Sequence, residues 1–181
     1  QDGALAQQVI TADAAIDTAQ AALEEQVLVL MATQQPIAGD LRRLVAAIEI
    51  ASELERIGDY AKGIAKIVGR QEVPAKLAPT EQLPQMAQHA IAMLLEVLEA
   101  YVGEDAAVGQ RLAEADDRVD ALRRSGQAEL IAIMQRDPDL VPYAVSQLFI
   151  VHNIERIADR ATNIAERIVF MVSGENIELN P

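Results

Sequence analysis

Acidic side chains spaced four residues apart are the first feature of this sequence that could do chemistry. Residues 54–65 read L-E-R-I-G-D-Y-A-K-G-I-A, and residues 154–168 read I-E-R-I-A-D-R-A-T-N-I-A-E-R-I. Each copy pairs a Glu with an Asp, as Glu55 with Asp59 and Glu155 with Asp159. On a helix such a pair shares one face, where like charges repel by about 0.3 kcal/mol. Because unpartnered burial costs far more, the doubled pattern indicates a cation site; a solvated acidic face is the alternative.

The composition excludes several classes of protein. With 181 residues, 51% of them hydrophobic, the chain can bury a core in one large or two small domains. A formal charge of −13 disfavours nucleic acid and favours a basic partner or bound metal. The lack of cysteine excludes disulfides and thiolate metal sites and fits a reducing compartment. No apolar run reaches the roughly 18 residues that could cross a bilayer, and no secretory signal is visible.

Hydrophobic residues recur at helical spacing in five segments, and no segment alternates with period two for long enough to form a strand. We expect helices over about residues 2–33, 36 or 40–68, 83–101, 105–136 and 140–172. Pro36 and Asp137-Pro138 mark turns between antiparallel helices, and Gly69 and Gly174 are suited to ending helices. The predicted fold class is therefore all-α.

A duplication becomes visible when the turns are used as anchors. Residues 13–17 read D-A-A-I-D and residues 116–120 read D-D-R-V-D, so the helix before each turn also carries an acid pair at four-residue spacing. Residues 1–72 are predicted to form a first helical repeat of two long helices, without its opening helix in this sequence. Residues 73–80 are the expected linker, and residues 81–181 a complete three-helix bundle.

The acids of each hairpin are predicted to meet at one height. In an antiparallel pair both helices rise by about 1.5 Å per residue from the turn, so residues equidistant from its centre lie level. The first-half acids are equidistant from Pro36, and the second-half acids from the Asp137-Pro138 bond. The two predicted groups are Asp13, Asp17, Glu55 and Asp59 in the first hairpin, and Asp116, Asp120, Glu155 and Asp159 in the second.

Four carboxylates without Cys or matched His form a hard oxygen site, which suits Mg²⁺, Mn²⁺, Ca²⁺ or iron, and also admits Zn²⁺. So many charges could bridge more than one ion. The alternative is that Arg56 and Arg156 neutralise the acids as ordinary ion pairs. Since one Arg per four acids leaves an excess of negative charge, we expect both Arg side chains either to contact the acids from behind, without replacing a metal ion, or to lie in solvent.

Three other polar residues are possible metal ligands by residue type. Asn163 lies one turn beyond Asp159 and could assist it, but Gly63 occupies the matching place in the first half. His89 and His152 have no Cys or His at ligand spacing, so we interpret them as surface or core residues.

The two acidic motifs resemble those of the PhoU family of phosphate uptake regulators. The resemblance rests on E-R-I-G-D-Y-A and on E-R-I-A-D-R-A-T-N-I-A-E-R-I-V followed by F-M-V-S-G-E, and it extends over essentially the whole chain. It implies two PhoU-like three-helix bundles related by a pseudo-twofold internal repeat, with multinuclear clusters of iron, zinc, manganese or magnesium on the eight acids. Gly63 and Lys66 depart from the pattern of the second half, so a weaker or different first cluster is expected.

The resemblance also implies a function. It implies a cytoplasmic negative regulator of phosphate transport and phosphate-responsive two-component signalling, an adaptor between the ATPase of the phosphate ABC transporter and a sensor histidine kinase. A homodimer is a further implied state, with no nucleic acid bound and membrane association only through partners. We expect no enzyme, because a carboxylate-bridged di-metal bundle needs Glu-x-x-His on two helices and the sequence has none. A metal-free helical scaffold that binds a basic partner is the other alternative.

Overall fold

The computed structural model describes residues 2–70, 74 and 81–179, and within them the chain is helical without strands. The elements are α1 (Gly3–Gln34), α2 (Gly39–Arg70), α3 (Gln82–Gly103), α4 (Val108–Arg136), the short 3-10 helix η1 (Pro138–Leu140) and α5 (Val141–Ser173). The all-α prediction is confirmed. In this part of the chain no helix has an apolar stretch suited to crossing a membrane.

The helix ends follow from local chemistry at most positions. Asp2 caps α1, because its carboxylate accepts hydrogen bonds from the backbone N–H groups of Ala4 and Leu5, both at 3.0 Å. Gly174 ends α5 with a φ of 80° and donates its N–H to the Phe170 carbonyl at 2.9 Å. The expected cap Asp105 instead accepts from Ala107 N at 2.9 Å, and α4 begins only at Val108.

Two other expected boundaries differ from the structure. Gly69 does not end the second helix, since α2 continues to Arg70. Pro36 does not open that helix either, because α2 begins at Gly39. Of the predicted linker, residues 73–80, only residue 74 lies within the described residues.

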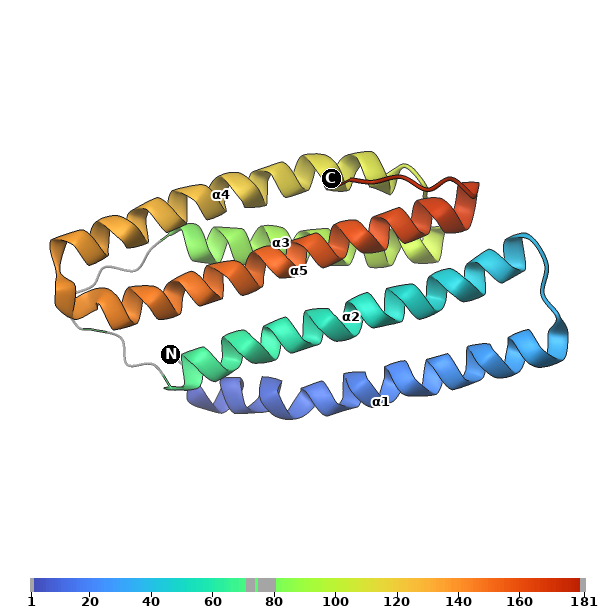
Figure 1. Cartoon of the computed structure of the whole chain (residues 1–181), viewed down its shortest axis with the longest axis horizontal. Helices are drawn as coiled ribbons and strands as arrows, with labels where there is room; N and C mark the ends of the chain where they lie inside the picture. The colour runs from blue at the N-terminus through green and yellow to red at the C-terminus, as the bar shows by residue number, and fades with distance from the viewer. Residues whose placement is uncertain (1, 71–73, 75–80, 180–181) are drawn as a thin grey trace.

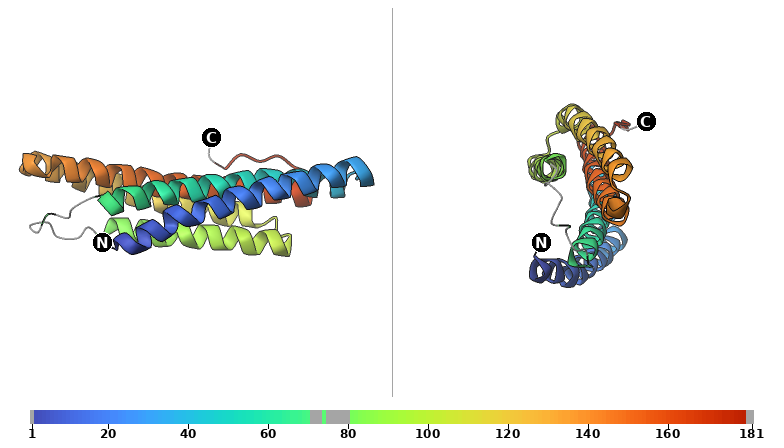
Figure 2. Two further views of the ribbon diagram at one scale, coloured as in Figure 1. Left: turned by 90° about the horizontal axis from the view of Figure 1, so that it is seen from below. Right: turned by 90° about the vertical axis from the view of Figure 1, so that its left-hand side faces the viewer.

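The helices pack side by side with α5 at the centre (Figure 1). α1 and α2 form a hairpin, α3, α4 and α5 form a three-helix bundle, and α2 packs along α5 to join the two. Seen along the helices, α1, α2, α5 and α4 form a curved layer with α3 on its concave side (Figure 2). Within the described chain α1 packs against α2 alone, and its side chains Leu5, Leu28 and Val29 are therefore more than half exposed.

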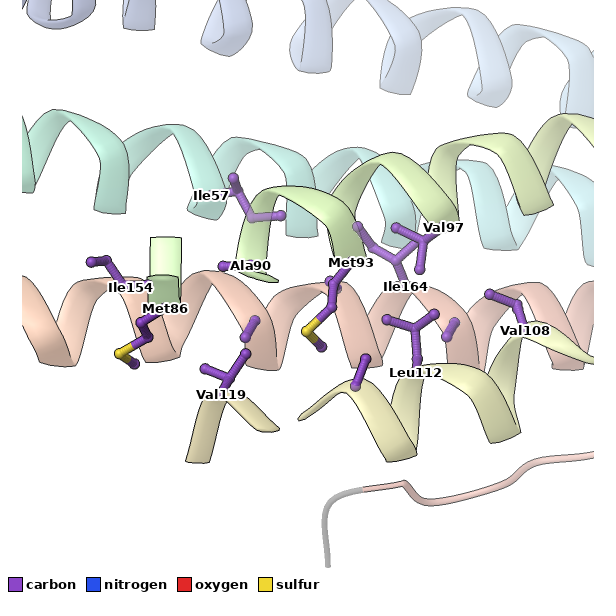
Figure 3. Close-up of a cluster of buried hydrophobic side chains, with 14 of the residues drawn as sticks. Ile57, Met86, Ala90, Met93, Val97, Val108, Leu112, Val119, Ile154 and Ile164 are labelled. Carbon is purple, nitrogen blue, oxygen red and sulfur yellow. The ribbon is translucent and has the colours of Figure 1, made fainter. Parts of the chain in front are cut away.

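The hydrophobic core lies between α3, α4 and α5 and extends to α2 (Figure 3). Ala158, Ala161 and Ala165 are fully buried on α5, and these small side chains let the neighbouring helices approach it closely. Larger side chains fill the remaining space; those that are fully buried include Met86, Met93, Leu112, Leu130, Ile164 and Ile168. Because α2 of the first repeat shares this core with the second repeat, the predicted separation of the chain into two domains at residues 73–80 stays a prediction.

The contacts between α2 and α5 reveal the internal symmetry. Polar contacts join Glu53 to Asn163 and Tyr60 to Arg156, which fixes one antiparallel register. That register places Gly58 level with Ala158, which are corresponding positions of the two repeated motifs. The pseudo-twofold axis therefore passes between α2 and α5 at this height, about one turn or less from the acids.

Candidate metal centre

The first hairpin brings its acids together around Lys62. Lys62 Nζ donates to Asp13 Oδ2 on α1 and lies 3.4 Å from Asp59 Oδ1 on α2. Asp13 is only 5% exposed. Gly58 permits the close approach of α1 at this height, since a Cβ there would lie 3.0 Å from Ile16 Cδ1. The bond to Asp13 is the main reason that the pKa of Lys62 is raised, so Lys62 remains an ammonium group.

Glu55 shows that all four acids of the first hairpin act on one another. Partial burial raises the pKa of its carboxyl, and the negative charges of Asp59, Asp17 and Asp13 raise it further. The nearby guanidinium of Arg56 opposes these effects. The three other acids that the turn-centred register selected therefore lie near enough to Glu55 for their charges to act on it.

In the second hairpin the charges of two other predicted acids act on Asp159. Burial raises the pKa of Asp159, and the charges of Glu155 on α5 and Asp120 on α4 raise it further. Arg156 and Arg160 act in the opposite direction. The remaining predicted ligand, Asp116, lies on α4 one turn before Asp120.

Arg156 forms an ion pair with the second acid group and is not solely exposed to solvent. Its Nη1 donates to Asp159 Oδ2 at 2.8 Å, and its Nε lies 3.3 Å from the Tyr60 hydroxyl on α2. The guanidinium also lies 5.9 Å from the centre of the Tyr60 ring. Because Tyr60 follows Asp59 in sequence, Arg156 connects the second acid group to the helix that carries the first.

Asn163 does not assist the acids. Its Nδ2 donates to Glu53 Oε2 at 3.1 Å across the α2–α5 contact. Arg56 also binds Glu53, at 2.7 Å, and so lies outside the first acid group as predicted. His152 is an exposed residue whose Nδ1 lies 3.4 Å from Glu155 Oε2, in agreement with its interpretation as a surface side chain.

Three cations that contact the acids, Lys62, Arg123 and Arg124, were not predicted from the sequence. Lys62 follows Asp59 by three residues, and Arg123 and Arg124 follow Asp120 by three and four, at 3.2 and 3.0 Å. Opposite charges at these spacings on a helix attract each other, so the sequence already indicated these ion pairs. What it did not reveal is that Lys62 also reaches across to Asp13.

The two hairpins differ in how well their residues suit a metal ion. Among the described residues no three His, Asp or Glu side chains converge closely enough to hold one. In the first hairpin the Lys62 ammonium lies between acids of both helices, so the arrangement does not fit a metal. In the second, the contacts of Arg156 with Asp159 and of Arg123 with Asp120 run along their own helices, and Arg156 also reaches Tyr60 on α2. These long side chains can rotate away without helix movement, and the carboxylates that remain suit a hard cation.

The raised pKa of Asp159 makes a prediction about pH. The folded state binds this proton more tightly than the unfolded chain, so the contribution of Asp159 to the free energy of unfolding grows as the pH falls through the folded pKa. In metal-free buffer, the melting temperature of the native protein relative to Asp159→Asn should rise as the pH falls from neutral to about pH 4. Calorimetry at a series of pH values measures this difference.

Asp105 provides a comparison of opposite sign. Its hydrogen bond from Arg111 lowers its pKa, so its contribution is lost as the pH falls. The native protein relative to Asp105→Asn should therefore keep its stability down to about pH 4 and lose it only as the pH falls further, through the lowered pKa of Asp105. If the melting temperatures of the two variants, each relative to the native protein, changed with pH in the same direction, burial and like charges would not determine the pKa of Asp159.

Together these features define a class of protein: a helical bundle built from a repeated hairpin, with an acidic group on each copy. The sequence matches the PhoU domain over residues 1–68 and 83–168. The chain belongs to the PhoU family.

Characterised relatives and solved structures agree with this assignment. The chain is 40% identical over 176 residues to the phosphate-specific transport system accessory protein PhoU homolog of Rhizobium meliloti, covering 96% of this chain and 73% of the relative. The Caulobacter vibrioides homolog of the same name is 39% identical, with 98% and 77% covered.

Two crystal structures have the same fold. The phosphate transport system regulatory protein PhoU from Streptococcus pneumoniae superposes with a TM-score of 0.88 at 32% identity, covering 98% of this chain and 83% of that one. PhoU from Pseudomonas aeruginosa gives a TM-score of 0.89 at 29% identity, with 96% and 84% covered. The predicted pair of PhoU-like repeats, the first with two helices here and the second with three, is confirmed.

Proposed function

We propose that this chain is a cytoplasmic, metal-binding negative regulator of phosphate transport and phosphate-responsive two-component signalling. It would act as an adaptor between the ATPase of the phosphate ABC transporter and a sensor histidine kinase. Relatives named as accessory or regulatory proteins of phosphate transport support this role, and we assign no catalytic step. The single observation that supports the metal-binding part is that each hairpin carries acids from both of its helices close enough for their charges to act on one another.

In the second hairpin Asp116 and Asp120 on α4, with Glu155 and Asp159 on α5, would hold the metal. A bound di- or trivalent ion would supply positive charge that offsets the repulsion among these carboxylates. The helices position the ligands, since α5 is anchored by its buried core face. Acids contributed by both helices would then lock α4 against α5 and fix the surface presented to partners. In the first hairpin, Asp13, Asp17, Glu55 and Asp59 would take an ion only after Lys62 leaves.

Metal binding is tested by equilibrium dialysis against Mn²⁺, Zn²⁺ or Fe²⁺ followed by elemental analysis. The native chain should retain metal, and the double variant Glu155→Gln/Asp159→Asn should bind it more weakly by roughly tenfold or more. Glu114→Gln, an exposed acid on the same α4 helix, is the matched control and should bind as the native chain does. Metal at about 100 times its Kd should also stabilise the native chain by about 2.7 kcal/mol. An unchanged melting temperature after chelation would count against a structural metal.

The regulatory role is tested in cells that lack their own copy of this protein. Expression of the native chain should restore repression of a phosphate-responsive reporter when phosphate is abundant. The Glu155→Gln/Asp159→Asn variant should restore less repression at equal protein level. A reporter that stays fully active with the native chain present would contradict the proposed negative regulation.

Lys62 favours a second candidate function, a metal-free helical scaffold. Its ammonium already neutralises part of the first acid group and joins α1 to α2. The net charge of −13 would then attract a basic partner directly. The dialysis experiment separates the two candidates, because a scaffold of this kind retains no metal in either hairpin.

A further inference from the structure

Lys62 is the feature of the first hairpin that the metal-binding function does not explain. Its side chain is 26% exposed and contacts Asp13, which is 5% exposed, as well as Asp59. Unlike the pairs of Asp120 with Arg123 and Arg124, which stay on α4, this contact crosses from α2 to α1. A charged nitrogen therefore lies between carboxylates of the two helices, which is the place where an ion would have to bind.

The second repeat carries a different residue at the corresponding position. The motif copies are offset by one hundred residues, which aligns Lys62 with Thr162. Thr162 is fully buried and uncharged, and its hydroxyl donates to the backbone carbonyl of Asp159 at 2.8 Å. The second hairpin therefore has carboxylates of the same types but no ammonium group at the position that corresponds to Lys62.

We propose that Lys62 is a tethered cation that takes the place of a metal ion in the first hairpin. Its ammonium neutralises Asp13, holds α1 to α2 without metal and excludes a divalent ion from this acid group. Metal binding is then confined to the second hairpin, where Thr162 brings no charge. This confinement rests on the proposed metal-binding function, whereas the exclusion at the first hairpin does not.

The test compares Mn²⁺ binding to the full chain and to Lys62→Met by isothermal titration and elemental analysis. Methionine keeps the length of the side chain and removes the charge. The native chain should bind Mn²⁺ in the second hairpin only. Lys62→Met should bind additional Mn²⁺ in the first hairpin, with an affinity there at least roughly tenfold higher than that of the native chain. Adding Asp13→Asn to Lys62→Met should remove that gain, because the added site needs the buried carboxylate.

Two matched controls isolate the position and the charge. Lys66→Met removes the same charge one turn further along α2, where the side chain is exposed, and should bind as the native chain does. Lys62→Arg keeps a cation between the acids and should not gain a site. Equal gains in Lys62→Met and Lys66→Met would overturn the proposal, since net charge alone would then account for the effect.

Stability keeps the test decisive if Lys62→Met folds poorly. Removing Lys62 leaves the buried Asp13 carboxylate without its ammonium partner, so the variant should melt at a lower temperature in chelator. Excess Mn²⁺ should restore its melting temperature if the proposal is correct. The proposal would be overturned if Lys62→Met bound no additional Mn²⁺ and if excess Mn²⁺ did not raise its melting temperature.

The two proposals fail in different ways. If the native chain binds no Mn²⁺ but Lys62→Met gains a site, the role of Lys62 stands and the metal-binding function falls. If the native chain already fills both hairpins, so that Glu155→Gln/Asp159→Asn removes only part of the metal, the role of Lys62 falls and the metal-binding function stands.

Discussion

Replacing Glu53 with alanine is expected to lower the free energy of unfolding by about 3 kcal/mol. Glu53 is 12% exposed and lies between the repeats, where it accepts hydrogen bonds from Arg56 at 2.7 Å, Asn163 at 3.1 Å and Arg160 at 3.2 Å. Arg160 is similarly buried; its Nη1 makes the contact with Glu53, and its Nε has no hydrogen-bond partner among the described residues. Removing the carboxylate would leave this guanidinium as a nearly buried charge without its partner, which is the costly way to break an ion pair.

Glu49→Ala is the matched control. Glu49 lies one turn before Glu53 on α2 and pairs with Arg167 on α5 at 3.4 Å, but it is 42% exposed. Both glutamates line the same groove of about 490 Å³. Because solvent screens the Glu49 pair, its loss should change the free energy of unfolding by less than about 0.5 kcal/mol.

Urea unfolding followed by circular dichroism measures both variants. The Glu53→Ala difference corresponds to a fall of roughly 6–12 °C in melting temperature for a chain of this size. Equal losses in Glu53→Ala and Glu49→Ala would show that burial does not decide the strength of these pairs. A loss confined to Glu53→Ala would identify this residue as the main polar link between the two repeats.

The fold was predictable from the sequence because its signals are local. Helical periodicity, with Pro36 and Asp137-Pro138 at the turns, identified five helices and their pairing. The details of the turns were less accessible. Gln35 and Ala38 both adopt a φ of 48° although neither is glycine and both are exposed. The Ala38 carbonyl accepts a hydrogen bond from Arg42 N at 3.1 Å, so the turn is held by local backbone contacts that residue type alone does not reveal.

The acids of the candidate site were predictable for the same reason. Their spacing depends only on the helical repeat and on the turn centre. The contacts that cross between repeats were not, since Arg156 and Tyr60 are 96 residues apart and meet only after α2 packs on α5. Asn163 could not be assigned correctly either, because its partner Glu53 lies across that same contact.

Ile164→Ala is expected to lower the free energy of unfolding by about 3–4 kcal/mol. Ile164 is fully buried on α5 and lies beside Val97 of α3 and Leu112 of α4 in the core (Figure 3). Truncation removes apolar surface from a close-packed region and leaves a cavity that three long helices cannot collapse to fill. Since α5 also packs against α2, this single side chain stabilises the whole arrangement of helices that carries the acids.

Phe149→Ala is the control on the same helix, because it also truncates a large apolar side chain to alanine but does so outside the core. Phe149 is 58% exposed, so its truncation should change the free energy of unfolding by less than about 0.5 kcal/mol. Chemical denaturation of both variants, at equal protein concentration and in chelator, keeps bound metal from contributing. If Ile164→Ala cost no more than Phe149→Ala, α5 would not be the packing centre of the molecule. The level placement of Glu155 and Asp159 opposite α4 would then need another cause.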